Sequence, residues 1–250
     1  MPASLHSTDR PAPSGTTPAP GRAMASLMGL AIFGEKVAAR TYLAMAELRS
    51  EHADLLRKFA RMEARHGSSF LEASRANGVE PDREFADGEL GYLIEQVDDH
   101  AGAGDFDALA VLQGFIVESL AIATYEPFLG VADRYPGARE AFGRALEDER
   151  YHVDWITRYL RLRYFDATDE FLALADRVNA RGVDCVGGTM MNIARYLDQV
   201  GMSGADCAAG MLDGYAGLLE GVGLEPRSAL KSVTTLFAPL MVKYRQQAHA

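Results

Sequence analysis

The chain has 250 residues, 48% of them hydrophobic, and a formal net charge of −10. A chain of this length can bury the core of one sizeable domain. Its acidic balance argues against nucleic acid or an anionic membrane as the main partner. Because no run of about 18 apolar residues occurs, no membrane span is expected. The two cysteines, Cys185 and Cys207, are expected to be buried free thiols in a reducing cytoplasm, with a disulfide as the alternative.

The first 22 residues differ in composition from the rest of the chain. They are rich in Pro, Ala, Ser and Thr, and they lack the apolar centre of a signal peptide. Such a composition is typical of disordered segments. We therefore expect a disordered tail over residues 1–22 and a single helical domain over residues 23–250.

Beyond the tail, apolar residues recur at spacings of three and four, which predicts an all-α domain. The predicted helices, about eight in total, span 24–48, 51–77, 84–100, 105–132 and 137–164, with three more beginning near 166, 205 and 225. The turn sequences NGVEPD, HAGAGD and DRYPG separate the earlier ones. We expect Pro136 to be the first residue of the fifth helix, Pro127 to bend the fourth and Gly187-Gly188 to make the sixth irregular.

Two of the six histidines follow a glutamate by three residues, as Glu63–His66 and Glu149–His152. On a helix, this spacing places both side chains on one face. Glu35 precedes Glu63 by 28 residues. An antiparallel hairpin that turns at their midpoint, residue 49, puts both at one level, about 21 Å from the turn. The midpoint of Glu118 and Glu149 falls at DRYPG in the same way. Each hairpin then presents one Glu opposite one Glu-x-x-His, which is the layout of a ferritin-like four-helix bundle.

The surroundings of Glu118 and Glu35 indicate burial. Glu118 is the only charge in VLQGFIVESLAIATY, and Glu35 ends the apolar stretch LMGLAIFGE. A carboxylate in a core is costly unless it is paired or binds a metal. Two divalent cations would neutralise four carboxylates, and mixed oxygen and imidazole ligands suit iron or manganese and also permit zinc. The predicted metal ligands are Glu35, Glu63, His66, Glu118, Glu149 and His152.

The segments around these ligands resemble the aldehyde-deformylating oxygenases (aldehyde decarbonylases) over about residues 25–240, in GEKVAARTYLAMAEL, KFARMEARHGSSFLEASRANGVEPD, LQGFIVESLAIATYEPFLGVAD and EDERYH. The resemblance implies a non-haem di-iron enzyme that uses O2 and an external electron donor, either ferredoxin with its reductase or a chemical reductant. Such enzymes cleave a fatty aldehyde to a hydrocarbon and formate. It also implies two iron ions (Fe2+/Fe3+), or a manganese–iron pair. Glu35 and Glu118 would be terminal ligands and Glu63 and Glu149 bridges, with Tyr42, Tyr125 and Asp148 orienting the ligands.

Several residues depart from the family pattern. Where the family has a pair of Phe residues along its alkyl channel, this chain has Glu89 and Leu90, and where it has Ala then Phe, this chain has Ser119 and Leu120. Ser74 replaces a Cys. A long alkyl chain needs a continuous apolar tunnel, so these changes predict a substrate more polar than a long-chain fatty aldehyde. The predicted pocket residues are Phe33, Phe70, Gln113, Ser119, Leu120 and Glu89.

Other functions remain open at this point. The main alternative is a di-iron N-oxygenase that oxidises an amine, hydroxylamine or hydrazine to an N-oxide or azoxy-type product in a specialised biosynthetic pathway. An iron-storage ferritin-like protein, a metal-free helical interaction module and a ribonucleotide-reductase radical subunit fit the length or the ligands less well. As partners we expect a small-molecule substrate and the electron donor, without nucleic acid, in a monomer or homodimer.

Overall fold

The computed structural model describes the backbone of residues 20–248 and the side chains of 21–179, 182 and 187–238. The predicted tail over residues 1–19 lies outside the described residues. The helical domain begins earlier than expected, because residues 20–22 belong to the first helix rather than to the tail. A proline at the first helical position is favourable there, since its missing N–H has no partner inside the helix.

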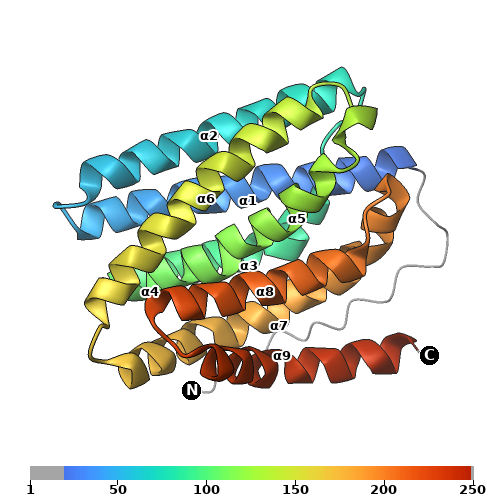
Figure 1. The fold of residues 1–250 in the computed structure, drawn as a ribbon. Helices are drawn as coiled ribbons and strands as arrows, with labels where there is room; N and C mark the ends of the chain where they lie inside the picture. The colour runs from blue at the N-terminus through green and yellow to red at the C-terminus, as the bar shows by residue number, and fades with distance from the viewer. Residues whose placement is uncertain (1–19, 249–250) are drawn as a thin grey trace, which may run out of the picture.

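The described residues are helical and contain no strand (Figure 1). The elements are α1 (Pro20–Leu48), α2 (Ala53–Ala76), α3 (Arg83–Gly102), α4 (Phe106–Val111), the π-helix η1 (Leu112–Glu118), α5 (Ser119–Leu129), the 3₁₀ turn η2 (Ala132–Arg134), α6 (Ala138–Arg163), α7 (Thr168–Val200), α8 (Gly204–Val222) and α9 (Pro226–Ala248). This confirms the predicted all-α fold, with α4, η1 and α5 together forming the predicted fourth helix.

Four segments form the bundle that holds the predicted ligands: α1, α2, the run from α4 to α5, and α6 (Figure 1). The turns at 49–52 and 130–137 contain both predicted hairpin midpoints. The helix α3 runs back along α1 as the crossover between the two hairpins. Helices α7 and α8 pack against the bundle on the side of α1 and α5, and α9 lies beyond them. The helix α2 is therefore left at the edge of the molecule (Figure 1).

Local chemistry sets the helix starts. The side chains of Asp82, Asp105 and Ser203 accept hydrogen bonds from backbone N–H groups three residues later, at 3.0, 3.0 and 3.1 Å, and so satisfy donors that a helix leaves free at its first turn. Ahead of α6, Gly137 has φ +75°, a conformation that a residue with a Cβ adopts only with strain. The prediction for Pro136 was wrong, because α6 begins after Gly137 and Pro136 stays in the turn.

The segment Phe106–Leu129 is long and apolar enough to cross a membrane, but 83% of that stretch is buried inside the protein. Its apolar character is thus explained by its place at the centre of the bundle.

Two further expectations can be compared with the fold. The helix α7 runs unbroken through Gly187 and Gly188, so the predicted irregularity was wrong. The helix α5 continues through Pro127 and ends two residues later, so a bend there stays a prediction.

Of the two cysteines, Cys207 is a buried free thiol. Burial raises the pKa of the Cys207 thiol to about 11, so the thiol stays protonated and behaves as a small apolar side chain. The side chain of Cys185 lies outside the described residues.

Candidate metal centre

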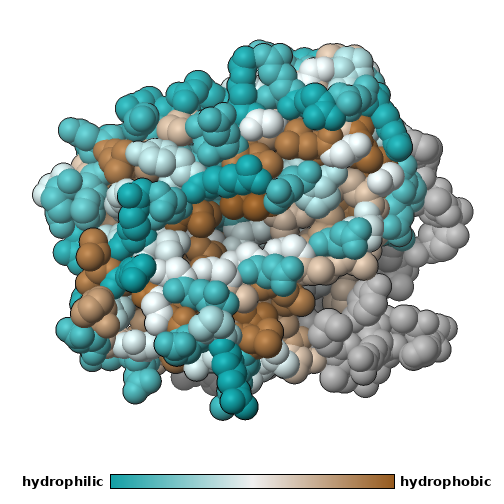
Figure 2. Space-filling view, in the orientation of Figure 1, coloured by the Kyte–Doolittle hydropathy of each residue, from teal (hydrophilic) through white to brown (hydrophobic). Residues whose placement is uncertain are grey.

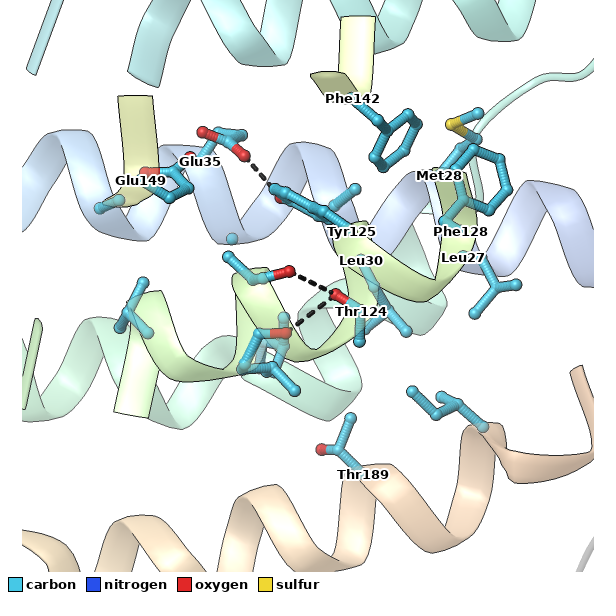
Figure 3. Close-up of a pocket in the computed structure, with 18 of the residues that line it drawn as sticks. Leu27, Met28, Leu30, Glu35, Thr124, Tyr125, Phe128, Phe142, Glu149 and Thr189 are labelled. Carbon is cyan, nitrogen blue, oxygen red and sulfur yellow. Dashed lines mark hydrogen bonds between the residues drawn. The ribbon is translucent and has the colours of Figure 1, made fainter. Parts of the chain in front are cut away.

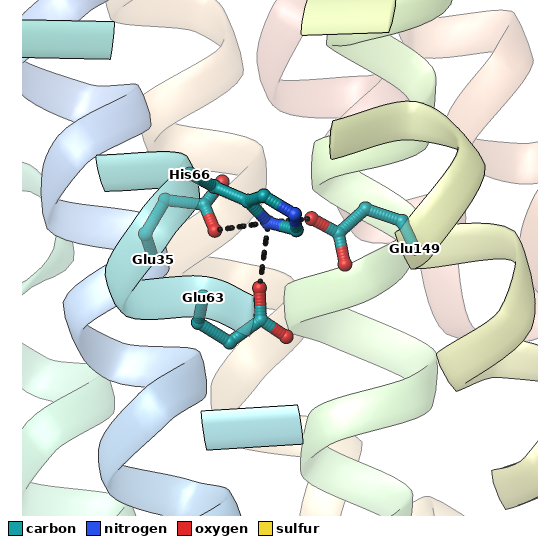
Figure 4. A group of neighbouring side chains, drawn as sticks. All are labelled: Glu35, Glu63, His66 and Glu149. Atoms are coloured by element: carbon teal, nitrogen blue, oxygen red, sulfur yellow. Dashed lines mark hydrogen bonds and ion pairs between the residues drawn. The ribbon is translucent and has the colours of Figure 1, made fainter. Parts of the chain in front are cut away.

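The bundle brings all six predicted metal ligands into one buried cluster. Figure 4 shows four of them, Glu35, Glu63, His66 and Glu149. Their ligand atoms form two groups in which all atoms lie within 4.8 Å of one another: Glu35, Glu63, His66 and Glu149 in one, and Glu63, Glu118, Glu149 and His152 in the other. The two groups share Glu63 and Glu149. Two carboxylates common to neighbouring groups are the arrangement that two bridged metal ions need.

The imidazoles define the two ends of the cluster. Nδ1 of His66 lies 3.2 Å from Glu35 Oε2, 3.0 Å from Glu63 Oε2 and 3.2 Å from Glu149 Oε1. Nδ1 of His152 lies 2.9 Å from Glu63 Oε1, 2.9 Å from Glu149 Oε2 and 3.6 Å from Glu118 Oε1. Each of the two shared carboxylates, Glu63 and Glu149, therefore turns one oxygen to each imidazole. Nδ1 is the ring nitrogen that each histidine turns to the carboxylates.

The electrostatics show that this cluster is short of positive charge. Burial raises the pKa of Glu35 to about 8, and burial together with the charges of Glu118, Glu63 and Glu35 raises that of Glu149 well above its usual range. Burial alone would lower the pKa of His66 and raise that of Glu63. Hydrogen bonds between imidazoles and carboxylates outweigh it, so the pKa of His66 is raised and that of Glu63 falls to about 2. Without cations, the cluster must hold protons in their place.

The donor set fits a pair of divalent cations. Among the described residues, no Lys or Arg forms an ion pair with any of the four carboxylates. Four buried carboxylates with only two imidazoles as cationic partners would be costly in a core. Oxygen donors mixed with imidazole nitrogen are the ligand types that suit iron and manganese.

The three residues predicted to orient the ligands all contact them. The Tyr42 hydroxyl donates to Glu118 Oε1 at 2.6 Å, and the Tyr125 hydroxyl donates to Glu35 Oε1 at 2.5 Å. On the other side, Nε2 of His66 lies 3.0 Å from Asp148 Oδ2. Such outer partners fix the orientation of metal ligands and tune their basicity. The ring of His152 instead packs against the aromatic rings of Tyr42 and Phe59.

Sequence reasoning missed the π-helix η1, which changes the place of Gln113. Residues five apart come together on a π-helix, and here the Gln113 amide donates to Glu118 Oε1 at 2.9 Å. Gln113 was predicted to line the substrate pocket but instead supports a carboxylate. All residues of η1 are buried, so the apolar pattern is the same for an α-helix and a π-helix and carries no signal that separates them.

An apolar cavity of about 90 Å³ opens onto the cluster (Figure 3). It reaches Glu35, Glu118 and Glu149 at one end and Met24, Leu197 and Met202 at the other. Most of its wall is apolar. The exceptions beside the cluster, Tyr125, Thr124 and Thr189, use their hydroxyls within the protein: both threonines donate to backbone carbonyls.

Of the predicted pocket residues, Leu120 lines this cavity. The others lie elsewhere for identifiable reasons. Phe70 stacks on Phe142 with ring centroids 4.3 Å apart, and Ser119 donates to the Gly114 carbonyl at 3.1 Å. The Phe33 ring lies under the ammonium of Lys36, and the Glu89 carboxylate accepts from Asn192 at 3.0 and 3.1 Å. The helix α3 turns Leu90 inward and Glu89 away from the cavity.

Comparisons with known proteins agree with this geometry. The sequence model of one protein family, described as long-chain fatty aldehyde decarbonylase, matches residues 21–236. The chain belongs to the long-chain fatty aldehyde decarbonylase family. Among solved structures, it is similar to "Protein 19 with aldehyde deformylating oxidase activity" from Synechococcus, with 28% sequence identity and a TM-score of 0.81. The match covers 88% of this chain and 98% of that chain. The resemblance inferred from the sequence is therefore confirmed, and family membership supports an enzyme.

Proposed function

We propose that this decarbonylase-family protein is a non-haem di-iron oxygenase that cleaves an aldehyde with an apolar chain. The observation that carries the proposal is the apolar cavity ending at Glu35, Glu118 and Glu149. Such a cavity takes an apolar body and leaves a polar head group beside the metal ligands. The expectation of a more polar substrate depended partly on Glu89 and Ser119, and neither side chain reaches the cavity wall. It depended also on the loss of aromatic residues at Leu90 and Leu120, which line the cavity but are themselves apolar.

The residues of the chain have distinct parts in this reaction. Glu35, His66, Glu118 and His152 would hold two metal ions from the outside, with Glu63 and Glu149 between them. When bound, iron supplies the activation of O2. Tyr125 keeps Oε1 of Glu35 engaged and leaves Oε2, which faces His66, for a metal. Tyr42 and Gln113 hold Glu118 in place through its Oε1. The apolar wall keeps water from the head group.

The stoichiometry requires an outside source of electrons. Cleavage of an aldehyde by one O2 to hydrocarbon, formate and one water balances only with four electrons and three protons. Among the described residues, no cysteine lines the cavity. An external donor, as expected from the sequence, is part of the proposal, in a cytoplasmic setting.

A second candidate, oxidation of a nitrogen centre, is favoured by one feature of the cavity. A Cβ placed on Gly34, next to Glu35, would meet no atom within 4 Å. Ala31, Ala38 and Ala121 also line the cavity, so it has room beside the metal ligands. A straight-chain aldehyde needs space on one side of its reacting carbon. A substituted hydroxylamine or hydrazine needs space on both sides of the reacting atom.

One assay tests both candidates. Protein loaded anaerobically with ferrous iron is supplied with O2, a chemical reductant and either straight-chain aldehydes of increasing length or substituted hydroxylamines. Equal amounts of formate and of a hydrocarbon one carbon shorter would support aldehyde cleavage, and N-oxygenated product without formate would support the second candidate. Glu149→Ala removes a bridging carboxylate and should abolish both. Binding of far less than two irons per chain would contradict the proposal as a whole.

A further inference from the structure

The two imidazoles of the cluster differ in their access to solvent. His152 is fully buried, and its Nε2 has no hydrogen-bond partner. Nε2 of His66, in contrast, lies 3.0 Å from Asp148 Oδ2, and the Asp148 side chain is 32% exposed. A path of two side chains thus leads from the cluster through His66 and Asp148 to the surface between α2 and α6. Electron transfer slows steeply with distance. Electrons that enter through Asp148 and His66 have only a short way to the cluster, so this path favours fast transfer.

The surface beside this entry carries an unbalanced positive charge. Arg57, Lys58, Arg61 and Arg65 are exposed on α2, and we call them the α2 basic stripe. Arg65 adjoins His66 in sequence, and Arg61 lies about one turn before it. The only carboxylate of α2 between Arg57 and Ser69 is the buried Glu63. Figure 2 shows the outer surface over α2, at the top of the view, as mainly hydrophilic.

Comparison with α6 shows how the stripe differs. Four exposed arginines of α6, Arg139, Arg144, Arg150 and Arg158, pair with acidic residues, while Arg161 near its end forms no ion pair with a described residue. In the stripe, Arg57 lies 3.8 Å from Asp54, whereas no described carboxylate lies within ion-pair distance of Lys58, Arg61 or Arg65. On α6, the partly exposed Asp148 lies beside the stripe at its contact with His66. In a chain with a net charge of −10, unpaired cations beside an entry to the cluster indicate an acidic partner.

We propose that the α2 basic stripe is the docking surface for a small acidic iron–sulfur electron-transfer protein, with Asp148 and His66 as the electron entry. The inference rests on the proposed function, since it assumes a redox-active metal pair. In each transfer, one reduced iron–sulfur cluster loses an electron and one ferric ion of the pair gains it, without any bond being made or broken. An anionic lipid surface could also contact the stripe, but it would make no use of the path through Asp148 and His66.

The test compares two double variants with the same change in net charge. Arg61→Glu/Arg65→Glu reverses the stripe, and Arg161→Glu/Arg227→Glu reverses two exposed arginines at the end of α6 and the start of α9. The probe is a plant-type [2Fe–2S] ferredoxin. We expect its affinity and its rate of reducing the iron-loaded protein to fall about tenfold or more in the stripe variant at low salt, with little change in the control. The difference should shrink as ionic strength rises.

A second arm separates this inference from the proposed function. Turnover driven by a small uncharged mediator should be the same in the wild type and the stripe variant, since no docking is needed. If the wild type makes no product with any reductant, the proposed function fails, and ferredoxin binding still tests the stripe. Equal binding and reduction in both double variants would overturn the docking surface. So would loss of binding to anionic vesicles in the stripe variant while reduction by ferredoxin is unchanged.

Discussion

Within the cluster, hydrogen bonds from neighbouring side chains hold the carboxylates of Glu118 and Glu35 in place. Glu118 Oε1 accepts from both Tyr42 and Gln113, and Glu35 Oε1 accepts from Tyr125. Burial and the charge of the adjacent carboxylates raise the pKa of both tyrosines well above its usual range. The two phenols therefore stay protonated donors at any ordinary pH. Their part is to hold a carboxylate in place, and they do not supply charge.

Replacement of one phenol by Phe should accordingly weaken metal binding without disturbing the fold. In Tyr125→Phe, Glu35 Oε1 loses a donor at 2.5 Å and the carboxylate can rotate. We expect an affinity for Fe2+ lower by about 10- to 100-fold, the usual effect of removing such an outer partner. Competition with a chelator of known affinity measures it.

The matched control for Tyr125→Phe is Tyr215→Phe. The Tyr215 hydroxyl is buried and accepts from Asn179 at 2.6 Å, away from the cluster. This variant should lose stability, because Asn179 is left without that acceptor, but it should keep the affinity for Fe2+. If Tyr125→Phe binds iron as the control does, the hydroxyl has no part in positioning Glu35.

At the scale of the helices, the sequence predicts what periodicity and turn residues can encode. The hairpin geometry followed from Glu35 and Glu63, because their distances from a recognisable turn agree. The π-helix η1 could not be found, since every one of its residues is buried and any helical period gives the same apolar pattern. The wall of the cavity was also poorly predicted. Neighbours such as Glu89 and Leu90 point about 100° apart around one helix. The sequence does not determine the rotation of that helix, which decides which of the two faces inward.

The π-helix packs closely on α6, and Gly114 makes this packing feasible. A Cβ on Gly114 would lie 2.9 Å from Ile156 Cγ2, and Ile156 is fully buried. We expect Gly114→Ala to lower the free energy of unfolding by about 1–3 kcal/mol, the usual cost of overpacking. It should also weaken iron binding, because η1 carries Glu118. Chemical denaturation of the metal-free protein and iron titration measure the two effects separately.

Gly143→Ala on α6 is the control with the opposite sign. No atom lies within 4 Å of a Cβ at Gly143. Alanine is favoured over glycine inside a helix by about 1 kcal/mol, so this variant should be slightly more stable than the wild type. If Gly114→Ala is equally stabilising, the close approach of η1 to α6 does not constrain the sequence.

At the scale of the whole molecule, the cluster is a cost to the metal-free fold. Four carboxylates are buried at the centre of the bundle, and their pKa shifts differ in direction. The raised pKa of Glu35 means that its contribution to stability is present below about pH 4.5 and is lost as pH rises to about 8. The metal-free protein therefore carries a strain at neutral pH that cations relieve. Such a balance between stability and function is common at active sites.

Glu149→Gln tests this balance directly, because Gln has the shape of the protonated acid. Burial and three neighbouring carboxylates already favour the neutral form of Glu149, so the metal-free variant should unfold at a higher temperature than the metal-free wild type.

Bound metal should then reverse the order of the two unfolding temperatures. With metal at about 100 times its dissociation constant, binding adds about 2.7 kcal/mol to the wild type, which raises Tm by about 5–10 °C in a chain of this size. The variant should lose most of that gain, because the bridge between the two metals is gone. Calorimetry of both proteins with and without Fe2+ under anaerobic conditions gives the four values. If the metal-free variant is less stable than the metal-free wild type, the contacts of the Glu149 carboxylate with its neighbours stabilise the fold, and the predicted cost of burying that carboxylate is wrong.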